Sequence, residues 1–165
     1  MAEYWDLYDA ERNLLGRTIK RGDSFGEGEY YVCCEVWVQN SEGKLLMTQR
    51  HPDKKAGGLW EFTGGGVLAG ETTKQAALRE LEEELGVIAK EAELSLLDVY
   101  RHKNYFMDIF VVKKEVDIAM LKLQPEEVVD AKWISHEELL QMMEEKQVVW
   151  SVGLRYGMYG EKLRK

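Results

Sequence analysis

The amino-acid sequence predicts an α+β fold, and two kinds of pattern carry the prediction. Stretches rich in aromatic and β-branched residues, typical of strands, occur on both sides of the chain's midpoint, and 29–39 (EYYVCCEVWVQ) is the clearest. Between and after these stretches, capping signals open segments that have the periodicity of amphipathic helices. Strands that lie before, between and after helices predict a sandwich of sheet and helix layers.

Strands are expected wherever apolar or β-branched runs are bounded by polar or glycine-rich turns. Residues 3–19 predict a β-hairpin, because two apolar stretches, 4–8 and 14–19, flank a polar turn. The run Thr63-Gly64-Gly65-Gly66 is expected to be a glycine turn between two short strands. The strands expected after the hairpin are 29–39, 44–50, 59–62, 67–68, 93–100, 105–113 and 131–134.

The first helix is predicted to begin after Thr72. Thr72 and Gln75 match a capping box, and Gly86 lies where a left-handed residue commonly ends a helix. One sector of the helical wheel is apolar and would pack on a core. That sector contains Ala77, Leu78, Leu81 and Leu85.

The neighbouring sector of this helix gathers Glu80, Glu83 and Glu84, whereas Glu82 points away toward solvent. Each like-charged pair at this spacing costs a few tenths of a kcal/mol. Either these carboxylates form a solvated acidic face, or cations hold them together, because Mg²⁺ prefers clustered carboxylate oxygens. The glycine run before the helix favours the second interpretation, since glycine lets the backbone approach a phosphate ligand.

Two more helices are expected near the C-terminus. Ser135 and Glu138 make a second capping box, which opens a helix running to about Glu145. The tail 148–165 predicts a third helix that is weakened by glycines. These glycines are Gly153, Gly157 and Gly160.

Composition and charge narrow the class of protein. A chain of 165 residues, 45% hydrophobic and 32% charged, suits one soluble globular domain. The net charge of −8 argues against a nucleic-acid surface, which needs a basic patch, but it permits a phosphorylated small molecule held through metal. No apolar run is long enough for a membrane, and the acidic N-terminus does not resemble a signal peptide, so the cytoplasm is expected.

Cysteine and histidine show no recognisable site. Cys33 and Cys34 are adjacent, which fits neither a disulfide framework nor a zinc pattern. Because neighbouring residues on a strand face opposite sides, at least one of the two is expected in the core. His51, His102 and His136 are scattered and are expected to be surface or structural residues.

Residues 65–87 resemble the Nudix box of the MutT-like Nudix hydrolases. That pattern is a glycine, five residues, a glutamate, seven residues, then Arg-Glu-hydrophobic-any-Glu-Glu-any-Gly-hydrophobic. With about 0.07 for each of its fixed positions, a chance match is on the order of 10⁻⁸ per window. Thr63 is one departure, since many members have proline there. The matching residues are Gly65, Glu71, Arg79, Glu80, Leu81, Glu83, Glu84, Gly86 and Val87.

The resemblance implies a Nudix fold, a mixed β-sheet between helices, as a single domain over 1–165 with a β-hairpin extension at about 1–28. It implies an enzyme that hydrolyses a pyrophosphate bond in a nucleoside diphosphate linked to another group, with Mg²⁺ or Mn²⁺ as cofactor. By resemblance, Glu80, Glu83 and Glu84 are the metal ligands, together with the backbone carbonyl of Gly65.

One glutamate must also help to remove the proton of the attacking water. Glu80 is the candidate inside the box, and Glu126 or Glu127, in QPEEVVD, is the candidate outside it. Glu126 and Glu127 would otherwise form an exposed acidic turn. Glu71 and Arg79 lie about two helical turns apart and are expected to form a salt bridge that supports the site.

The expected partner is a small-molecule diphosphate, with neither nucleic acid nor membrane. A homodimer is expected only if an apolar patch near the N-terminal hairpin is exposed. Cationic side chains, namely Arg50, Arg101 and Lys103, either contact phosphate or cap strand ends. Aromatic side chains either stack on a base or sugar, or pack in the core as most aromatics do. These aromatics are Trp60, Phe62, Tyr30, Tyr31, Tyr105 and Phe106.

Two alternative functions remain. The N-terminal half, including WDLYDAERNLLGRTIKRGD, resembles the subgroup related to isopentenyl diphosphate isomerase, which implies proton transfer on an allylic diphosphate. That isomerase needs a cysteine where this chain has Thr63-Gly64-Gly65, and histidine ligands where it has Tyr30 and Tyr31. The other alternative is a catalytically silent nucleotide-binding domain. Such a domain would be expected to lose box carboxylates that this chain keeps.

Overall fold

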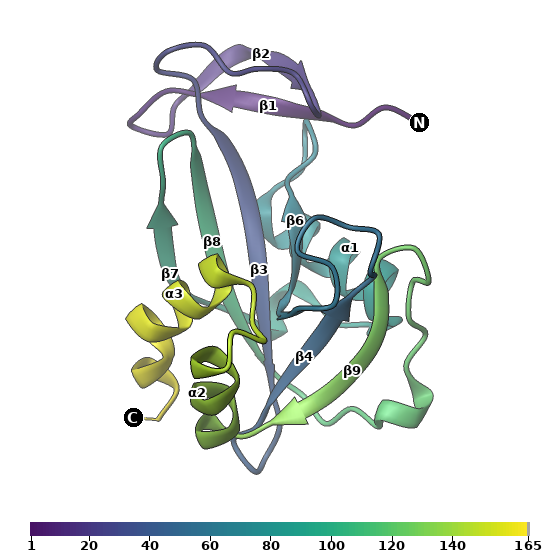
Figure 1. The fold of residues 1–165 in the computed structure, drawn as a ribbon. Coiled ribbons are helices and arrows are strands. Elements are labelled where there is room, and N and C mark those ends of the chain that lie inside the picture. Colours follow the sequence, from purple (N-terminus) through teal and green to yellow (C-terminus); the bar gives the residue numbers. More distant parts are fainter. Residues whose placement is uncertain (165) are drawn as a thin grey trace.

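A seven-stranded mixed sheet forms the centre of the computed structural model, which describes residues 1–164 (Figure 1). Its strand β3 pairs with β8 in parallel, and the other strand pairs of the sheet are antiparallel. The strands are β3 (Tyr31–Gln39), β4 (Leu45–Arg50), β5 (Trp60–Glu61), β6 (Thr63–Gly66), β7 (Leu94–Arg101), β8 (Tyr105–Lys113) and β9 (Val128–Ile134). Short 3₁₀ helices cover Glu91–Glu93, Ile118–Met120 and Gly160–Arg164.

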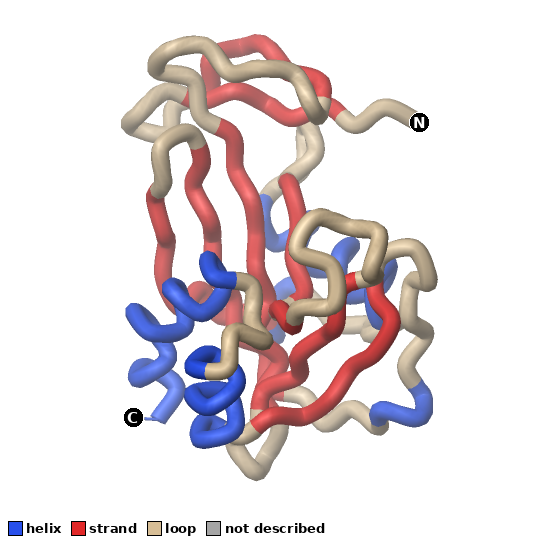
Figure 2. Tube along the Cα trace, viewed as in Figure 1, coloured by secondary structure: helices blue, strands red, loops and turns tan. Residues whose placement is uncertain are grey.

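Helices cover both faces of this sheet, as Figure 2 shows with helices in blue and strands in red. Helix α1 (Thr73–Leu85) packs on one face, where Leu81 joins alternate β3 residues such as Val36 in one buried cluster. Helices α2 (His136–Glu144) and α3 (Trp150–Tyr159) pack on the other face, around Trp37. Because successive strand residues face opposite sides, β3 supplies both cores. The predicted α+β sandwich with a mixed sheet is therefore confirmed.

The caps of α1 agree with the sequence. The Thr72 side chain accepts a hydrogen bond from the Gln75 backbone N–H, and the Gln75 side chain accepts one from the Thr72 N–H. Gly86 ends the helix at φ 68°, in the left-handed region. The second capping box, at Ser135, opens α2 as predicted. The apolar sector is also confirmed, with Leu78 partly buried and the other three residues buried, namely Ala77, Leu81 and Leu85.

The glycine run does not form the predicted turn. Thr63–Gly66 is strand β6, and the strand expected at 67–68 is absent. The reason is tertiary: β3 and β4 pair only at Gln39 and Leu45, so an edge of β3 stays free for β6. Other boundaries shift by a few residues, so that 29–39 begins at Tyr31, 131–134 begins at Val128 and the tail helix begins at Trp150. The expected tail also includes residue 165, which lies outside the described residues.

The N-terminal hairpin forms a separate two-stranded sheet of β1 (Tyr4–Tyr8) and β2 (Leu14–Lys20). Figure 1 shows it in purple at one end of β3 and β8. A bidentate pair between Arg12 and Asp108 of β8, with N–O distances of 2.6 and 2.7 Å, holds it there. Its apolar side chains Tyr4 and Leu14 are exposed, so the homodimer stays a prediction.

The structure can be compared with three further predictions, which concern the cysteines, the histidines and membrane-spanning segments. Cys33 and Cys34 are both buried free thiols, which confirms that at least one is a core residue. His136 shares a hydrogen bond with the hydroxyl of Tyr156, a structural role. None of the helices within residues 1–164 combines the length and the hydropathy that a membrane crossing requires.

Candidate functional site

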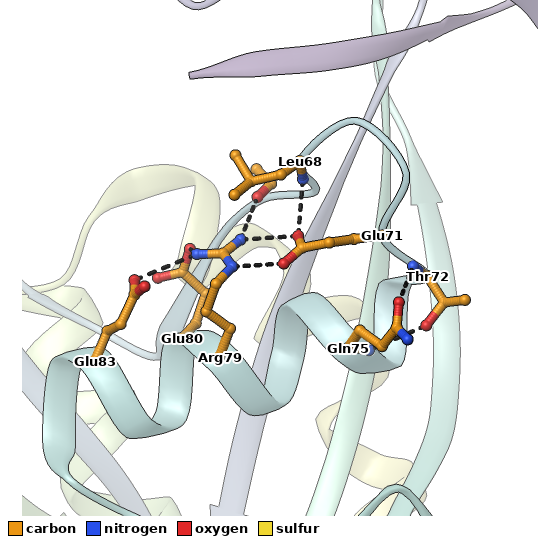
Figure 3. Close-up of polar contacts among 8 residues, drawn as sticks. Leu68, Glu71, Thr72, Gln75, Arg79, Glu80 and Glu83 are labelled. Atoms are coloured by element: carbon orange, nitrogen blue, oxygen red, sulfur yellow. Dashed lines mark hydrogen bonds and ion pairs between the residues drawn. The ribbon is translucent and has the colours of Figure 1, made fainter. Parts of the chain in front are cut away.

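Arg79 of α1 is the centre of a polar network that ties the preceding loop to the helix (Figure 3). Its Nε and Nη2 donate to the two carboxylate oxygens of Glu71 at 2.7 and 3.1 Å, and Nη2 also donates to the Gly66 carbonyl at 3.1 Å. The backbone N–H of Leu68 donates to Glu71 at 2.9 Å. The salt bridge that the sequence predicts between Glu71 and Arg79 is present, and it fixes the loop against the helix.

The third nitrogen of Arg79 faces the glutamate sector. Nη1 lies 2.9 Å from a carboxylate oxygen of Glu80 and 3.3 Å from one of Glu83 (Figure 3). Glu84 turns inward and is buried, whereas Glu82 is exposed. Within residues 1–164, no three His, Cys, Asp or Glu side chains lie close enough together to hold a metal ion. The guanidinium partly offsets the repulsion among these carboxylates.

Burial changes the acidity of two of these groups. It raises the pKa of Glu80 to about 6, although the Arg79 guanidinium opposes the shift. Burial, reinforced by the neighbouring Glu80 and Glu61 carboxylates, raises the pKa of Glu84 well above its usual range. A buried carboxylate with too little positive charge beside it is unfavourable, so this region suits an additional cation.

Gly65 brings the β6 backbone against the glutamates. A Cβ atom at this position would lie 2.3 Å from a carboxylate oxygen of Glu80, so any side chain would displace that carboxylate. The register of β6 on β3 places Gly65 opposite Cys34 and Gly64 opposite Glu35. Three successive glycines of β6, Gly64 to Gly66, therefore lie between α1 and the opposite face of the sheet.

A cavity of about 250 Å³ adjoins the carboxylates and brings most of the predicted site residues together. Glu127 lines it and forms an ion pair with Lys54 of the loop after β4, whereas Glu126 is exposed and lies outside the lining. Arg50 also lines it and is paired with Glu61, at 2.9 Å to each carboxylate oxygen. The predicted residues in its lining are Gly65, Glu80, Glu83, Glu84 and Glu127.

A second cavity of about 430 Å³ adjoins the first and shares five lining residues with it, among them Gly64 and Gly65. One wall is aromatic, because Trp5 of the hairpin stacks on Tyr31 with ring centroids 4.6 Å apart. The indole Nε1 of Trp5 is buried and has no hydrogen-bond partner within residues 1–164.

Of the aromatic candidates, Tyr31 and Phe62 line this larger cavity. The others lie outside the linings of both cavities, as do two of the cationic candidates, Arg101 and Lys103. Arg101 instead donates a hydrogen bond to the Tyr30 hydroxyl at 3.0 Å.

Sequence reasoning missed several lining residues. No local motif marks them, because each reaches its cavity through contacts between distant segments. Trp5, for example, packs on Gly66, and Arg155 bonds a residue 120 positions away. The side chains missed include Trp5, Arg21, Glu35, Lys54, Glu61 and Arg155.

Comparison with known proteins identifies the family. A sequence model described as the NUDIX domain matches residues 32–151, well over half of the chain. An uncharacterized Nudix hydrolase of Listeria monocytogenes is 37% identical over 139 residues, which cover 83% of this chain and 82% of that protein. One of Clostridium acetobutylicum is 28% identical over 156 residues, which cover 87% of this chain and 75% of that protein.

Solved structures share the fold. A crystal structure from Deinococcus radiodurans has a TM-score of 0.73 at 24% identity, and the match covers 89% of this chain and 92% of that one. A bifunctional NMN adenylyltransferase/ADP ribose pyrophosphatase from Francisella tularensis, complexed with AMP and a Mn ion, has a TM-score of 0.65 at 18% identity. That match covers 81% of this chain and 42% of the other.

Proposed function

Because the chain belongs to the Nudix hydrolase family, whose members act on nucleoside diphosphate derivatives, we propose that it is a divalent-metal-dependent pyrophosphohydrolase. It would cut the pyrophosphate bond of a nucleoside diphosphate linked to another group. One observation carries the proposal: a single cavity is lined by Glu80, Glu83 and Glu84 of α1, by Gly65 and by Glu127.

The residue types present suit a hard divalent cation, and the side chains of Glu80, Glu83 and Glu84 would have to move closer together to hold it, since in the described residues they are too far apart. Carboxylate and carbonyl oxygens are the ligands that Mg²⁺ and Mn²⁺ prefer, and Glu80, Glu83, Glu84 and the Gly65 carbonyl would provide them. The raised pKa values of Glu80 and Glu84 point the same way, since an added positive charge would favour their ionised forms. When bound, the cation would neutralise the diphosphate and acidify the attacking water.

The other residues of this cavity have separate tasks. Arg50 and Lys54 place positive charge in the lining, where it would attract phosphate oxygens in spite of the chain's net charge of −8. The candidates for the general base are Glu80 inside the box and Glu127 outside it. Glu127 forms an ion pair with Lys54, which must separate before the Glu127 carboxylate can accept a proton. Glu126 is the weaker candidate, because it is exposed and does not line the cavity.

The proposal is tested with Glu83→Gln and Glu84→Gln. Each variant is offered nucleoside diphosphate sugars, dinucleoside polyphosphates, oxidised dNTPs and NADH with Mg²⁺. On the best substrate of the wild type, we expect turnover to fall by more than about a hundredfold, since even outer-shell changes at metal sites cost up to that factor. Circular dichroism should show an unchanged fold.

Glu82→Gln is the matched control, because Glu82 lies on the same helix but is exposed. It should keep wild-type turnover. Full activity in Glu83→Gln and Glu84→Gln would show that these carboxylates are not the ligands. A wild-type protein that binds these compounds without hydrolysing them would instead be a silent domain.

No observation favours the isomerase alternative. Tyr31, at a position where the isomerase would need a histidine ligand, stacks on Trp5. The run Thr63-Gly64-Gly65 supplies no thiol and is hydrogen-bonded to β3 as a strand. Relatives named by activity include a CTP pyrophosphohydrolase from Escherichia coli, 48% identical over 52 residues that cover 32% of this chain and 38% of that protein.

A further inference from the structure

Arg155 of α3 and Glu35 of β3 form an ion pair at the larger cavity. Both side chains are only 4% exposed. Arg155 donates from Nε to one carboxylate oxygen of Glu35 at 3.3 Å and from Nη2 to the other at 2.5 Å. The indole Nε1 of Trp37 donates to Glu35 at 2.9 Å, so the carboxylate is held from two sides.

Stability alone is a weak reason for such a pair. Removing two charges from water costs several kcal/mol per ion, and well-packed apolar residues often serve the fold as well or better. Both members of this pair line the larger cavity, where a ligand would meet them. Contact with a ligand in this cavity is therefore a better reason for the pair than stability.

One nitrogen of the Arg155 guanidinium is not used by the ion pair. Nε and Nη2 are used by Glu35, and Nη1 has no hydrogen-bond partner in the described part of the chain. Among residues 1–164, Trp5 Nε1 is the only buried side-chain nitrogen or oxygen without a hydrogen-bond partner. Arg155 Nη1 also has no partner in this range, so it must be in contact with solvent. Arg155 lines the cavity, and Nη1 is the guanidinium nitrogen that Glu35 leaves free to donate to a ligand.

The pair lies across β6 from the box glutamates. A Cβ atom at Gly65 would meet Glu80, whereas one at Gly64 would lie 3.0 Å from the Glu35 Cα. Neighbouring strand residues face opposite sides, so β6 divides the carboxylates of α1 from the Arg155 side. Gly64 and Gly65 line both cavities. A diphosphate beside the glutamates would therefore have the larger cavity next to it, with Arg155 in its lining.

We propose that Arg155 recognises an oxygen acceptor on the group attached to the diphosphate, and that Glu35 and Trp37 are positioning residues for its guanidinium. The inference rests on the proposed function in that the ligand is a diphosphate. The lining supports it, because four cationic side chains and two carboxylates favour electron-rich oxygen. Arg155, Trp5 and Tyr31 lie outside the range 32–151 that the family model matches, whereas Glu35 and Trp37 lie within it.

The test measures binding by titration calorimetry with Mg²⁺ and three non-hydrolysable probes. Methylenediphosphonate carries the diphosphate mimic alone, and the α,β-methylene analogues of ADP and UDP add a nucleoside. The wild type should bind the nucleotide probes more tightly than methylenediphosphonate. Arg155→Lys should lower the affinity for the nucleotide probes by about tenfold, the effect of one charged hydrogen bond, and leave the affinity for methylenediphosphonate unchanged.

Arg17→Lys is the matched control. Arg17 pairs with Glu29, is 55% exposed and lies outside both cavities, so this change should leave the affinity for all three probes at the wild-type value. Ser151→Leu tests the location independently, because Ser151 lies one turn before Arg155 on α3 and lines the same cavity. It should weaken the nucleotide probes selectively even if Arg155→Lys fails to fold.

The two nucleotide probes locate the acceptor. If the variants lose affinity for both analogues, the acceptor lies on the shared ribose. If they lose affinity for the UDP analogue alone, the acceptor is a base carbonyl, which adenine lacks. Equal affinity of the wild type for all probes, no selective loss in the variants, or an equal loss for methylenediphosphonate would overturn the inference. Since binding is read without turnover, such a result is distinct from failure of the hydrolase proposal, which turnover tests.

Discussion

At the scale of single residues, Arg79 shows how one side chain organises the candidate site. Its three nitrogens contact Glu71, Glu80, Glu83 and the Gly66 carbonyl at once. A planar guanidinium suits this task, because its five donors are arranged as a fixed fork. A lysine ammonium is a compact point charge and cannot hold the loop and the helix carboxylates in one geometry.

Arg79→Lys should therefore lower the affinity for the activating metal. We expect the Mg²⁺ concentration for half-maximal activity to rise by about 10–100-fold, because residues that orient metal ligands have effects of this size. Activity measured against Mg²⁺ concentration reads this directly.

Arg17→Lys is the control for this change, since Arg17 pairs with Glu29 and is 55% exposed, outside both cavities. Such a surface pair contributes about 0–1 kcal/mol, so Arg17→Lys should behave as wild type. An Arg79→Lys protein with an unaltered Mg²⁺ requirement would show that the network is dispensable for metal binding.

At the scale of elements, the caps of α1 could be predicted from the sequence, whereas strand β6 could not. The capping box and glycine stop of α1 involve residues three or four apart or at a helix end, so the sequence contains the interacting partners. β6 depends on a free edge of β3, about thirty residues earlier in the chain. Glycine has low strand propensity, and only tertiary pairing overrides it here. The same reasoning explains why Trp5 and Arg155 escape prediction.

Adjacent glycines of β6 should respond differently to alanine. At Gly65 the added Cβ meets the end of the flexible Glu80 side chain, so we expect a modest change in melting temperature. Turnover should nevertheless fall by about a hundredfold, as a shift of about 1 Å in a positioned group can cause.

Gly64→Ala is the contrasting variant, because its Cβ would lie 2.3 Å from the Cys34 carbonyl oxygen, which is backbone and cannot move aside. It should lower the melting temperature far more than Gly65→Ala does. Equal melting temperatures together with full turnover in Gly65→Ala would show that the close approach to Glu80 has no catalytic importance.

At the scale of the whole molecule, the site joins segments that the sequence leaves far apart. The resemblance at 65–87 predicts the box residues, and their shared cavity agrees with that expectation. The walls of the larger cavity come from the N-terminal hairpin, β3 and α3, which meet only when the sheet is assembled. No periodicity or spacing within one segment predicts the contacts among the hairpin, β3 and α3. The sequence therefore indicates the expected chemistry, whereas the lining of the larger cavity is known only from the fold.

Assembly of the fold also concentrates negative charge, which leads to a prediction about stability. Glu80, which is partly buried, lies near the buried Glu84, so a cation that binds only the folded state should stabilise it. At about 100 times its dissociation constant, Mg²⁺ or Mn²⁺ would add about 2.7 kcal/mol. For a chain of this size, that energy corresponds to a rise of about 5–10 °C in melting temperature.

Glu84→Gln should remove most of that rise, because one carboxylate ligand is lost. In chelator-treated protein the same variant should melt at or above the wild-type temperature, since it removes a carboxyl group whose ionised form is unfavourable in this buried place beside Glu80. Glu82→Gln, on the exposed face of the same helix, should keep the full metal-dependent rise. Differential scanning fluorimetry with EDTA, Mg²⁺ and Mn²⁺ makes the comparison. A wild-type melting temperature that neither ion changes would contradict the assignment of these carboxylates to a metal.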